Sequence, residues 1–379
     1  MIGLLPGIGT TLADLDRSGQ LHRCLLEWRA YARAFGGAKW FGYGPETAVF
    51  TVSGADSASR INDCPPPGCP WLEVVPKSRW VGALRACRAL RVLNLTGVVP
   101  ALMARDVFGL PYVLQVGYDA PAVARAHGKR LRAWLLRHLQ DLAVQRAAGV
   151  VYASMALWEA DYRRGLHRPM SETHFPPYAV IPNGVDLEHF RPLWRCPPGK
   201  RRVVYVGRLS REKNLPLLAA ACQQVGATLH LFGAGPLAAE LAALPGVSCY
   251  GPVPHYALPT ILADFDAFCL PSKTEGSPKA LLEAMACRVP CLVSHAVAEA
   301  LDLGPWEALA TAPLVYCRMG AGLADGLEAL LAGDGRAQAF AAAGRARVEA
   351  RHDLKKTLAD EIAFVHNAVG NHGQQAQQA

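Results

Sequence analysis

The chain has 379 residues, a length that suits two domains of ordinary size, each able to bury its own core. Hydrophobic residues make up 51% of it and charged residues only 18%, which excludes an intrinsically disordered chain and a coiled coil. The net charge of +8, from 39 basic and 31 acidic residues, favours anionic partners, such as a nucleoside diphosphate, an anionic membrane surface or a nucleic acid.

Several features bear on where the protein works. No apolar run approaches the length of about 18 residues that a membrane-spanning helix needs. The first residues lack the basic flank and the length of a signal peptide. The 11 cysteines are odd in number and scattered, which is typical of reduced thiols rather than of a disulfide framework. These features predict a cytoplasmic protein.

In the first half of the chain, short apolar segments alternate with longer amphipathic ones, a pattern that is typical of a doubly wound parallel sheet. We predict an N-terminal domain of this kind over residues 1–178. Strands are expected at 2–5, 48–51, 90–95, 112–116 and 150–153, and helices at about 21–35, 78–88 and 123–147.

Basic residues gather within the last of these helices. The segment from Arg125 to Arg146 carries six Lys or Arg side chains against one acid, Asp141, with Trp134 and leucines between them. Such a segment is either a helix with a solvated basic face or one that docks peripherally on an anionic membrane. A nucleic-acid partner is not favoured, because no recognised binding module accompanies the charge.

A Pro-rich region, 169–198, breaks the periodicity and separates the two halves. The second half repeats the alternation, and we predict a second domain over residues 179–350. After Asn214, one helical face carries Leu215, Leu218, Cys222 and Val225. Strands are expected near 202–207, 228–232, 247–250, 266–270 and 290–293.

Residues 271–285 read PSKTEGSPKALLEAM and follow the apolar run 267–270. Ser277 offers an N-cap oxygen and Pro278 suits the first helical position, so the segment predicts a strand, a short loop and a helix. A helix N-terminus directs free N–H groups at an anion, which suits a phosphate. Glu275 and Glu283 flank this point, and carboxylates accept hydrogen bonds from sugar or ribose hydroxyls. The local chemistry predicts a nucleotide-sugar site.

Four ordered motifs resemble one family. Glu275 and Glu283 resemble the E-x7-E signature of retaining glycosyltransferases of the GT-B fold, in particular glycosyltransferase family 4 (glycosyl transferases group 1). Residues 203–214, which read VVYVGRLSREKN, resemble its strand and loop that end in "EKN". Residues 181–186, which read IPNGVD, with Phe190 and Pro192, resemble its entry to the second domain, and residues 231–237, which read LFGAGPL, resemble its "GxGP" turn.

The resemblance implies an α/β fold with two Rossmann-like domains that face each other across a cleft. It implies a C-terminal helix, 351–369, that returns to the N-terminal domain, and we expect a disordered tail at 370–379. The implied activity is the metal-independent transfer of a sugar, without a cofactor, from a nucleoside-diphosphate sugar to a hydroxyl of a glycan, lipid-linked or small-molecule acceptor, with retention of configuration.

The resemblance also implies roles for single residues. Arg208 and Lys213 would neutralise the diphosphate that leaves, in place of a metal ion. Glu283 would bind the ribose hydroxyls, and Glu275 would contact the donor sugar near the reacting carbon. A charged solvated loop for the first pair, and a surface pair of Lys279 with Glu283, are the structural alternatives. The other predicted donor-binding residues are Gly9, Gly207, Gly233, Gly276, Ser277, Pro278 and Lys279.

The chain departs from the family's pattern at two points. Many relatives carry an aromatic residue where this chain has Ser277, which leaves the donor sugar open. Many carry a His followed by Asp where this chain has Tyr118 and Asp119. Asp119 could orient a sugar hydroxyl or act as a base, or it could cap the helix that begins near Pro121. Gly9 lies in a turn that either contacts the donor or only joins a strand to a helix.

Two other functions are compatible with the same residues. A nucleotide-sugar 2-epimerase of similar architecture would need no acceptor. A non-catalytic relative would bind the nucleotide-sugar without turning it over, which the replacement of the family's histidine by Tyr118 keeps open, although Asp119 keeps the acidic position. The residues leave the oligomeric state open as well.

Overall fold

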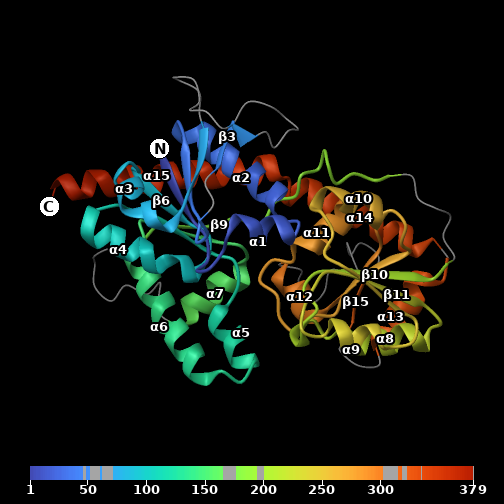
Figure 1. Ribbon diagram of the computed structural model, residues 1–379. Helices are drawn as coiled ribbons and strands as arrows, with labels where there is room; N and C mark the ends of the chain where they lie inside the picture. Colours follow the sequence, from blue (N-terminus) through green and yellow to red (C-terminus); the bar gives the residue numbers. More distant parts are fainter. Residues whose placement is uncertain are drawn as a thin grey trace. The chain divides into compact units, whose positions relative to one another are not determined.

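The computed structural model describes residues 1–45, 48–51, 60–61, 71–164, 176–193, 200–301, 315–317, 322–333 and 335–378. They divide into two compact units (Figure 1). Unit 1 comprises residues 1–181 and 358–379, and unit 2 comprises residues 182–357. Of the Pro-rich region expected between the two halves, 169–175 and 194–198 lie outside the described residues.

Unit 1 is built on a sheet whose described strands number nine, in the order β4-β3-β5-β2-β1-β6-β7-β8-β9. All neighbours run parallel except β3, which is antiparallel to both β4 and β5. The strands are β1 (Ile2–Leu5), β2 (Ala38–Phe41), β3 (Ala48–Thr51), β4 (Arg60–Ile61), β5 (Trp71–Val75), β6 (Ala89–Val92), β7 (Tyr112–Val116), β8 (Gly149–Tyr152) and β9 (Tyr178–Val180).

The five strands expected in the first half are confirmed, within a few residues at their ends. The sequence patterns did not predict β2 and β5, which lie side by side near the middle of the sheet. Each carries a charged residue within its apolar run, and the two charges neutralise each other, since Lys39 forms a mostly buried ion pair with Glu73. A charge that is paired only in the folded sheet hides a buried strand from a hydrophobicity pattern.

Helices cover both faces of this sheet. Helices α1, α2 and α15 lie on one side of it and α4, α6 and α7 on the other (Figure 1), and their side chains contribute to two separate cores. The helix expected at 123–147 is two helices, because Gly128 adopts a left-handed φ of 72° between them. The helices are α1 (Leu12–Arg17), α2 (Leu21–Phe35), α3 (Trp80–Arg85), α4 (Val98–Phe108), α5 (Ala120–Ala126), α6 (Arg130–Arg146), α7 (Met155–Arg163) and α15 (Leu354–Gln378).

The C-terminal helix α15 contributes its residues from 358 onward to unit 1. His366 stacks on Phe35 of α2 at 4.0 Å between ring centroids. A Cβ on Gly149 would lie 2.9 Å from Ala368, so a glycine in β8 lets the helix approach the sheet closely. The segment 370–378, where we expected disorder, continues the helix α15.

Unit 2 is a parallel sheet whose described strands lie in the order β12-β11-β10-β13-β14-β15. Its strands are β10 (Arg202–Val206), β11 (Thr228–Phe232), β12 (Val247–Gly251), β13 (Ala267–Leu270), β14 (Cys291–Ser294) and β15 (Val315–Cys317). Its helices are α8 (Leu215–Gln224), α9 (Ala238–Ala242), α10 (Leu258–Leu262), α11 (Lys279–Ala286), α12 (His295–Ala300), α13 (Gly322–Leu331) and α14 (Arg336–Arg351), with short 3₁₀ turns at η3 (Arg211–Lys213) and η4 (His255–Ala257).

All five strands expected in unit 2 are confirmed. The helix after Asn214 is confirmed as well, and its residues Leu215, Leu218 and Cys222 are buried in the core.

The strand order places a topological switch point between β10 and β13. From β10 the chain adds β11 and β12 on one side, then returns to add β13, β14 and β15 on the other. The connections therefore diverge at the carboxyl ends of β10 and β13, which pair directly through Val203 with Ala267. In open α/β sheets, ligands bind in the crevice outside such a point.

No helix within the described ranges is long and apolar enough to cross a membrane.

Candidate functional site

The loop after β10 is held by close backbone contact with the loop after β11. The amide of Gly207 donates to the carbonyl of Phe232 at 2.9 Å, and the amide of Leu209 donates to that of Ala234 at 3.0 Å. A Cβ on Gly233 would lie 1.9 Å from the Gly207 carbonyl oxygen, so only glycine fits there. The "GxGP" turn therefore has a structural role, and the donor contact of Gly233 stays a prediction.

The loops after β10 and β13 meet through an ion pair. The Lys213 ammonium lies 2.5 Å from Glu275 Oε1, and the side chains are 18% and 13% exposed. The hydroxyl of Ser272, which is buried, donates to the same carboxylate oxygen at 2.7 Å. The amide of Lys273 donates to the carbonyl of Glu212 at 2.8 Å and ties the two loops together. The structure thus brings together two predicted site residues from segments 62 positions apart.

Arg208 lies on the same loop with an exposed side chain. Its carbonyl accepts a hydrogen bond from the Tyr205 hydroxyl at 2.9 Å, which fixes the backbone. Burial, with Glu275 and Glu212 nearby, raises the pKa of Tyr205 well above its usual value, so this phenol stays neutral. Within the described ranges, no carboxylate pairs with the Arg208 guanidinium, which leaves a free cation beside the Lys213–Glu275 pair.

The helix α11 begins at Lys279, one residue later than the sequence predicted, with Pro278 as its N-cap. The expected cap by the Ser277 side chain is wrong, because that residue lies one position outside the helix start. Instead, the Ser277 carbonyl accepts a hydrogen bond from Asn183 Nδ2 at 3.4 Å. Within the described residues, no side chain caps this terminus, so the positive end of the helix dipole is not neutralised by a capping side chain.

Glu283 projects from α11 and is buried, with 4% of its surface exposed. Its Oε1 lies 2.8 Å from Nε2 of His255, which belongs to η4 and is equally buried. A solvent-exposed pair with Lys279, the structural alternative, does not fit this burial. Sequence reasoning missed His255, because it lies 28 positions before Glu283 and no helical or strand period joins the two.

The unit 1 candidates lie at the carboxyl ends of β1 and β7. Gly9 follows β1 with a left-handed φ of 83°. Asp119 follows β7, and its side chain accepts from the amide of Ala122 at 2.8 Å as the N-cap of α5. The capping role is thus observed, and the catalytic role stays a prediction. Tyr118, which stands beside it, is 37% exposed.

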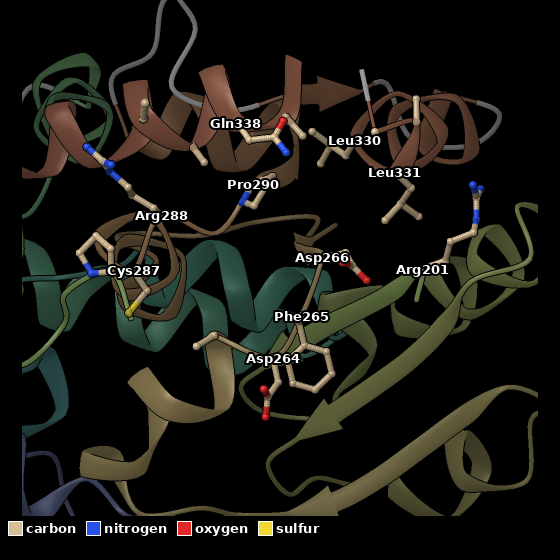
Figure 2. A pocket seen from close by; sticks show the side chains of 17 residues that line it. Arg201, Asp264, Phe265, Asp266, Cys287, Arg288, Pro290, Leu330, Leu331 and Gln338 are labelled. Carbon is tan, nitrogen blue, oxygen red and sulfur yellow. The ribbon is translucent and has the colours of Figure 1, made fainter. Parts of the chain in front are cut away.

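Unit 2 also holds a cavity of about 570 Å³, which lies at the amino ends of its strands rather than at their carboxyl ends (Figure 2). Arg201 and Asp266, which line it, come one residue before β10 and β13, whereas the candidate site lies at the carboxyl ends of these strands. None of the predicted site residues lines this cavity. Within the described ranges, no cluster of three or more His, Cys, Asp or Glu side chains could hold a metal ion.

Parts of this chain are similar in sequence to known proteins. Residues 200–349 match the family model "Glycosyl transferases group 1". A "GDP-mannose-dependent alpha-mannosyltransferase" of Mycolicibacterium smegmatis is 28% identical over 59% of this chain and 60% of its own length. A "GDP-mannose-dependent alpha-(1-6)-phosphatidylinositol dimannoside mannosyltransferase" of Mycobacterium tuberculosis is 35% identical over 31% of this chain and 35% of its own length. The chain spans about a third of the length of several curated relatives that it matches.

Solved structures match almost the whole chain. A sucrose-phosphate synthase from Thermosynechococcus elongatus superposes with a TM-score of 0.74 at 19% identity, over 100% of this chain and 98% of that one. HepE from Anabaena in complex with UDP-glucose superposes with a TM-score of 0.69 at 17% identity, over 97% of this chain and 99% of that one. The resemblance stated from the motifs is confirmed: residues 200–349 match the glycosyl transferases group 1, and the chain has the GT-B fold.

Proposed function

We propose that this protein is a glycosyltransferase that moves a sugar from a nucleoside-diphosphate sugar to a hydroxyl of a glycan, lipid-linked or small-molecule acceptor. The observation that carries this proposal is the set of groups at the carboxyl ends of β10 and β13. There, the Lys213–Glu275 pair, the exposed cation of Arg208, the start of α11 and the buried carboxylate of Glu283 all lie within the family match.

Each of these groups binds a different part of the donor in this proposal. The start of α11 and the two cations suit the diphosphate, because a helix N-terminus and the Arg208 and Lys213 side chains all offer positive charge. Arg208 can bind the diphosphate directly. Lys213 is paired with Glu275, and it can bind the diphosphate when that anion replaces Glu275 as its partner. Glu283 accepts from ribose hydroxyls, and Glu275 accepts from hydroxyls of the sugar. As charge develops on the departing diphosphate, the cations stabilise it, so we propose that no metal ion is needed.

The names of similar proteins support a choice of donors to test. HepE was solved with UDP-glucose, and the two mycobacterial relatives are named as dependent on GDP-mannose. The epimerase alternative is not favoured, because the curated relatives are named as sugar transferases. We propose retention of configuration on the resemblance of Glu275 and Glu283 to the E-x7-E signature.

We propose further that unit 1 contacts an anionic membrane peripherally, which would suit a lipid-linked acceptor. The outward side of α6 carries an exposed apolar stripe, Leu131, Trp134, Leu135 and Leu142. Arg125, Arg130 and Arg137 line a shallow hollow of about 320 Å³ beside Trp134. Exposed apolar and aromatic side chains among cations are typical of a helix that lies in the membrane interface.

The neighbouring helix α4 adds to this face. Its buried residues pack in the same core as those of α6, so both helices turn their other sides outward. Arg146 of α6 bonds Asp106 of α4 at 3.0 Å and joins the two helices. Val99, Met103 and Val107 form an exposed stripe on α4. We call the outward sides of α4 and α6 the helical face.

The test of the activity uses a panel of UDP- and GDP-sugars. A donor at 100 times its dissociation constant should stabilise the protein by about 2.7 kcal/mol, which a thermal shift detects. The stabilising donor is then incubated with candidate acceptors, and the anomeric configuration of the product is read by NMR. Turnover should survive EDTA. Loss of activity with EDTA and recovery with magnesium would refute the metal-free mechanism, and an inverted product would refute retention.

A further inference from the structure

His255 makes a direct and buried contact with Glu283. It begins η4, the turn that follows β12, and only 4% of its surface is exposed. Its Nε2 lies 2.8 Å from Glu283 Oε1. A carboxylate offers only acceptor sites, so the hydrogen of this bond belongs to Nε2. The Nε2–H bond therefore points to the carboxylate.

The imidazole ring is itself held in place. Phe190 is fully buried, and its ring lies 5.0 Å from that of His255 between centroids. Arg345 donates to the Phe190 carbonyl at 2.6 Å and to the Ala286 carbonyl, at the end of α11, at 2.8 Å. One guanidinium thus joins the segment that carries Phe190 to the helix that carries Glu283. The ring can turn little, and the direction of its N–H bond is fixed.

We propose that His255 is a positioning residue for Glu283. Its hydrogen bond holds the Glu283 carboxylate in the rotation in which the carboxylate accepts hydrogen bonds from the ribose hydroxyls of the donor. A carboxylate has about four acceptor sites, so the bond to His255 leaves capacity for two hydroxyls. A buried carboxylate that must bind such hydroxyls loses less freedom on binding if its rotation is already set. This inference rests on the proposed function, which supplies the ribose.

The test compares ribose with deoxyribose in nucleoside diphosphates. We would measure, by calorimetry, the affinity of the wild type for UDP, GDP and ADP, and for the 2′-deoxy and 3′-deoxy forms of whichever binds. His255→Phe keeps a ring of similar size and removes the donor. It should weaken the ribonucleotide about 10-fold and leave the deoxy forms almost unchanged, since a lost hydrogen bond to a charged group has this magnitude. His255→Gln restores an N–H donor and should recover most of the affinity.

A matched control and a second variant keep the test decisive. His230→Phe makes the same substitution on β11, where the ring stacks on Tyr250, and it should leave all affinities unchanged. If His255→Phe does not fold, His255→Asn, whose amide is too short to reach Glu283, should show the same loss of discrimination. Full ribonucleotide affinity in His255→Phe or His255→Asn, or an equal loss for the deoxy forms, would overturn the inference alone. No binding of any diphosphate by the wild type would overturn the proposed donor class together with it.

Discussion

Lys213 and Glu275 satisfy each other's charge in the absence of a donor. At 2.5 Å the ammonium and the carboxylate form a charge-assisted hydrogen bond, and Ser272 donates to the same oxygen. A diphosphate that arrives beside this pair would compete for the Lys213 charge and release Glu275 toward the sugar. Donor binding and the placing of Glu275 are therefore coupled in the mechanism that we propose.

The cations should act on turnover more than on binding. We expect Arg208→Ala and Lys213→Ala each to lower kcat by roughly 100-fold, by analogy with the loss of one donor to a developing anion. The affinity for the donor should fall less, because the charge on the leaving diphosphate grows only toward the transition state. Steady-state kinetics beside calorimetric titration separate the two effects. Arg211→Ala, an exposed cation on the same loop, is the control. A fall in affinity with unchanged kcat would contradict the assignment.

Glu283→Ala should weaken donor binding by at least about 1 kcal/mol, the scale of a hydrogen bond to a charged group. The reason is its place on α11, where its carboxylate is buried and already bonded by His255. Calorimetric titration with the identified donor measures the loss. Because the variant also leaves His255 without this acceptor, a thermal melt must show that the fold persists. Unchanged affinity in a folded variant would exclude the ribose contact.

At the scale of elements, the sequence predicted most of the strands of both sheets and the loop–helix unit that carries the two glutamates. Periodicity and cap chemistry are local, and the strands they predict are found where a segment is apolar throughout, as in β1 and β13. They failed at β2, whose Lys39 is neutralised by Glu73 on the adjacent strand. They also did not predict the helix α4. They also could not find His255, since its contact with Glu283 exists only after the sheet has formed.

The helical face of α4 and α6 should bind vesicles that contain anionic lipid. Each Lys or Arg near such a surface contributes roughly 1 kcal/mol, so changing Lys129, Arg130 and Arg132 together to Ser should weaken binding by about 100-fold at low salt. Liposome co-sedimentation measures this, and salt should release the wild type, because charges are screened within about 10 Å at 0.1 M. Changing Arg351, Lys355 and Lys356 to Ser, three exposed cations on other helices, should have little effect.

The apolar part of that face has its own signature. Met103→Ser with Val107→Ser leaves the charge unchanged and removes exposed apolar surface from α4. Binding should weaken at all salt concentrations, since apolar burial is not screened. A wild type that ignores anionic vesicles at low salt would show that the helical face is solvated and that the acceptor need not lie in a membrane.

At the scale of the whole molecule, the chain order sets how unit 1 is completed. Its sheet is built from residues 1–181, yet one of its cores closes only when residues 358–379 return. The returning helix brings Glu361 to Arg91 of β6, a guanidinium with no exposed surface. Burial opposes that charge, but Glu361 outweighs it and raises the pKa of Arg91. The Tyr31 hydroxyl donates to the same carboxylate at 2.5 Å, which joins α2, β6 and α15.

This network predicts which single change should most weaken unit 1. Glu361→Ala leaves the Arg91 charge buried without its carboxylate, and such a loss costs about 3–5 kcal/mol. Denaturant unfolding, followed by the fluorescence of the stacked Trp28 and Trp40 in the same unit, measures it. Glu159→Ala, which removes an exposed partner of Arg163 in unit 1, should cost no more than about 0.5 kcal/mol. Arg91→Met combined with Glu361→Leu removes both charges and should recover much of the loss, because a buried pair is often replaceable by apolar side chains. A stability equal to wild type in Glu361→Ala would show that the C-terminal helix does not depend on this pair.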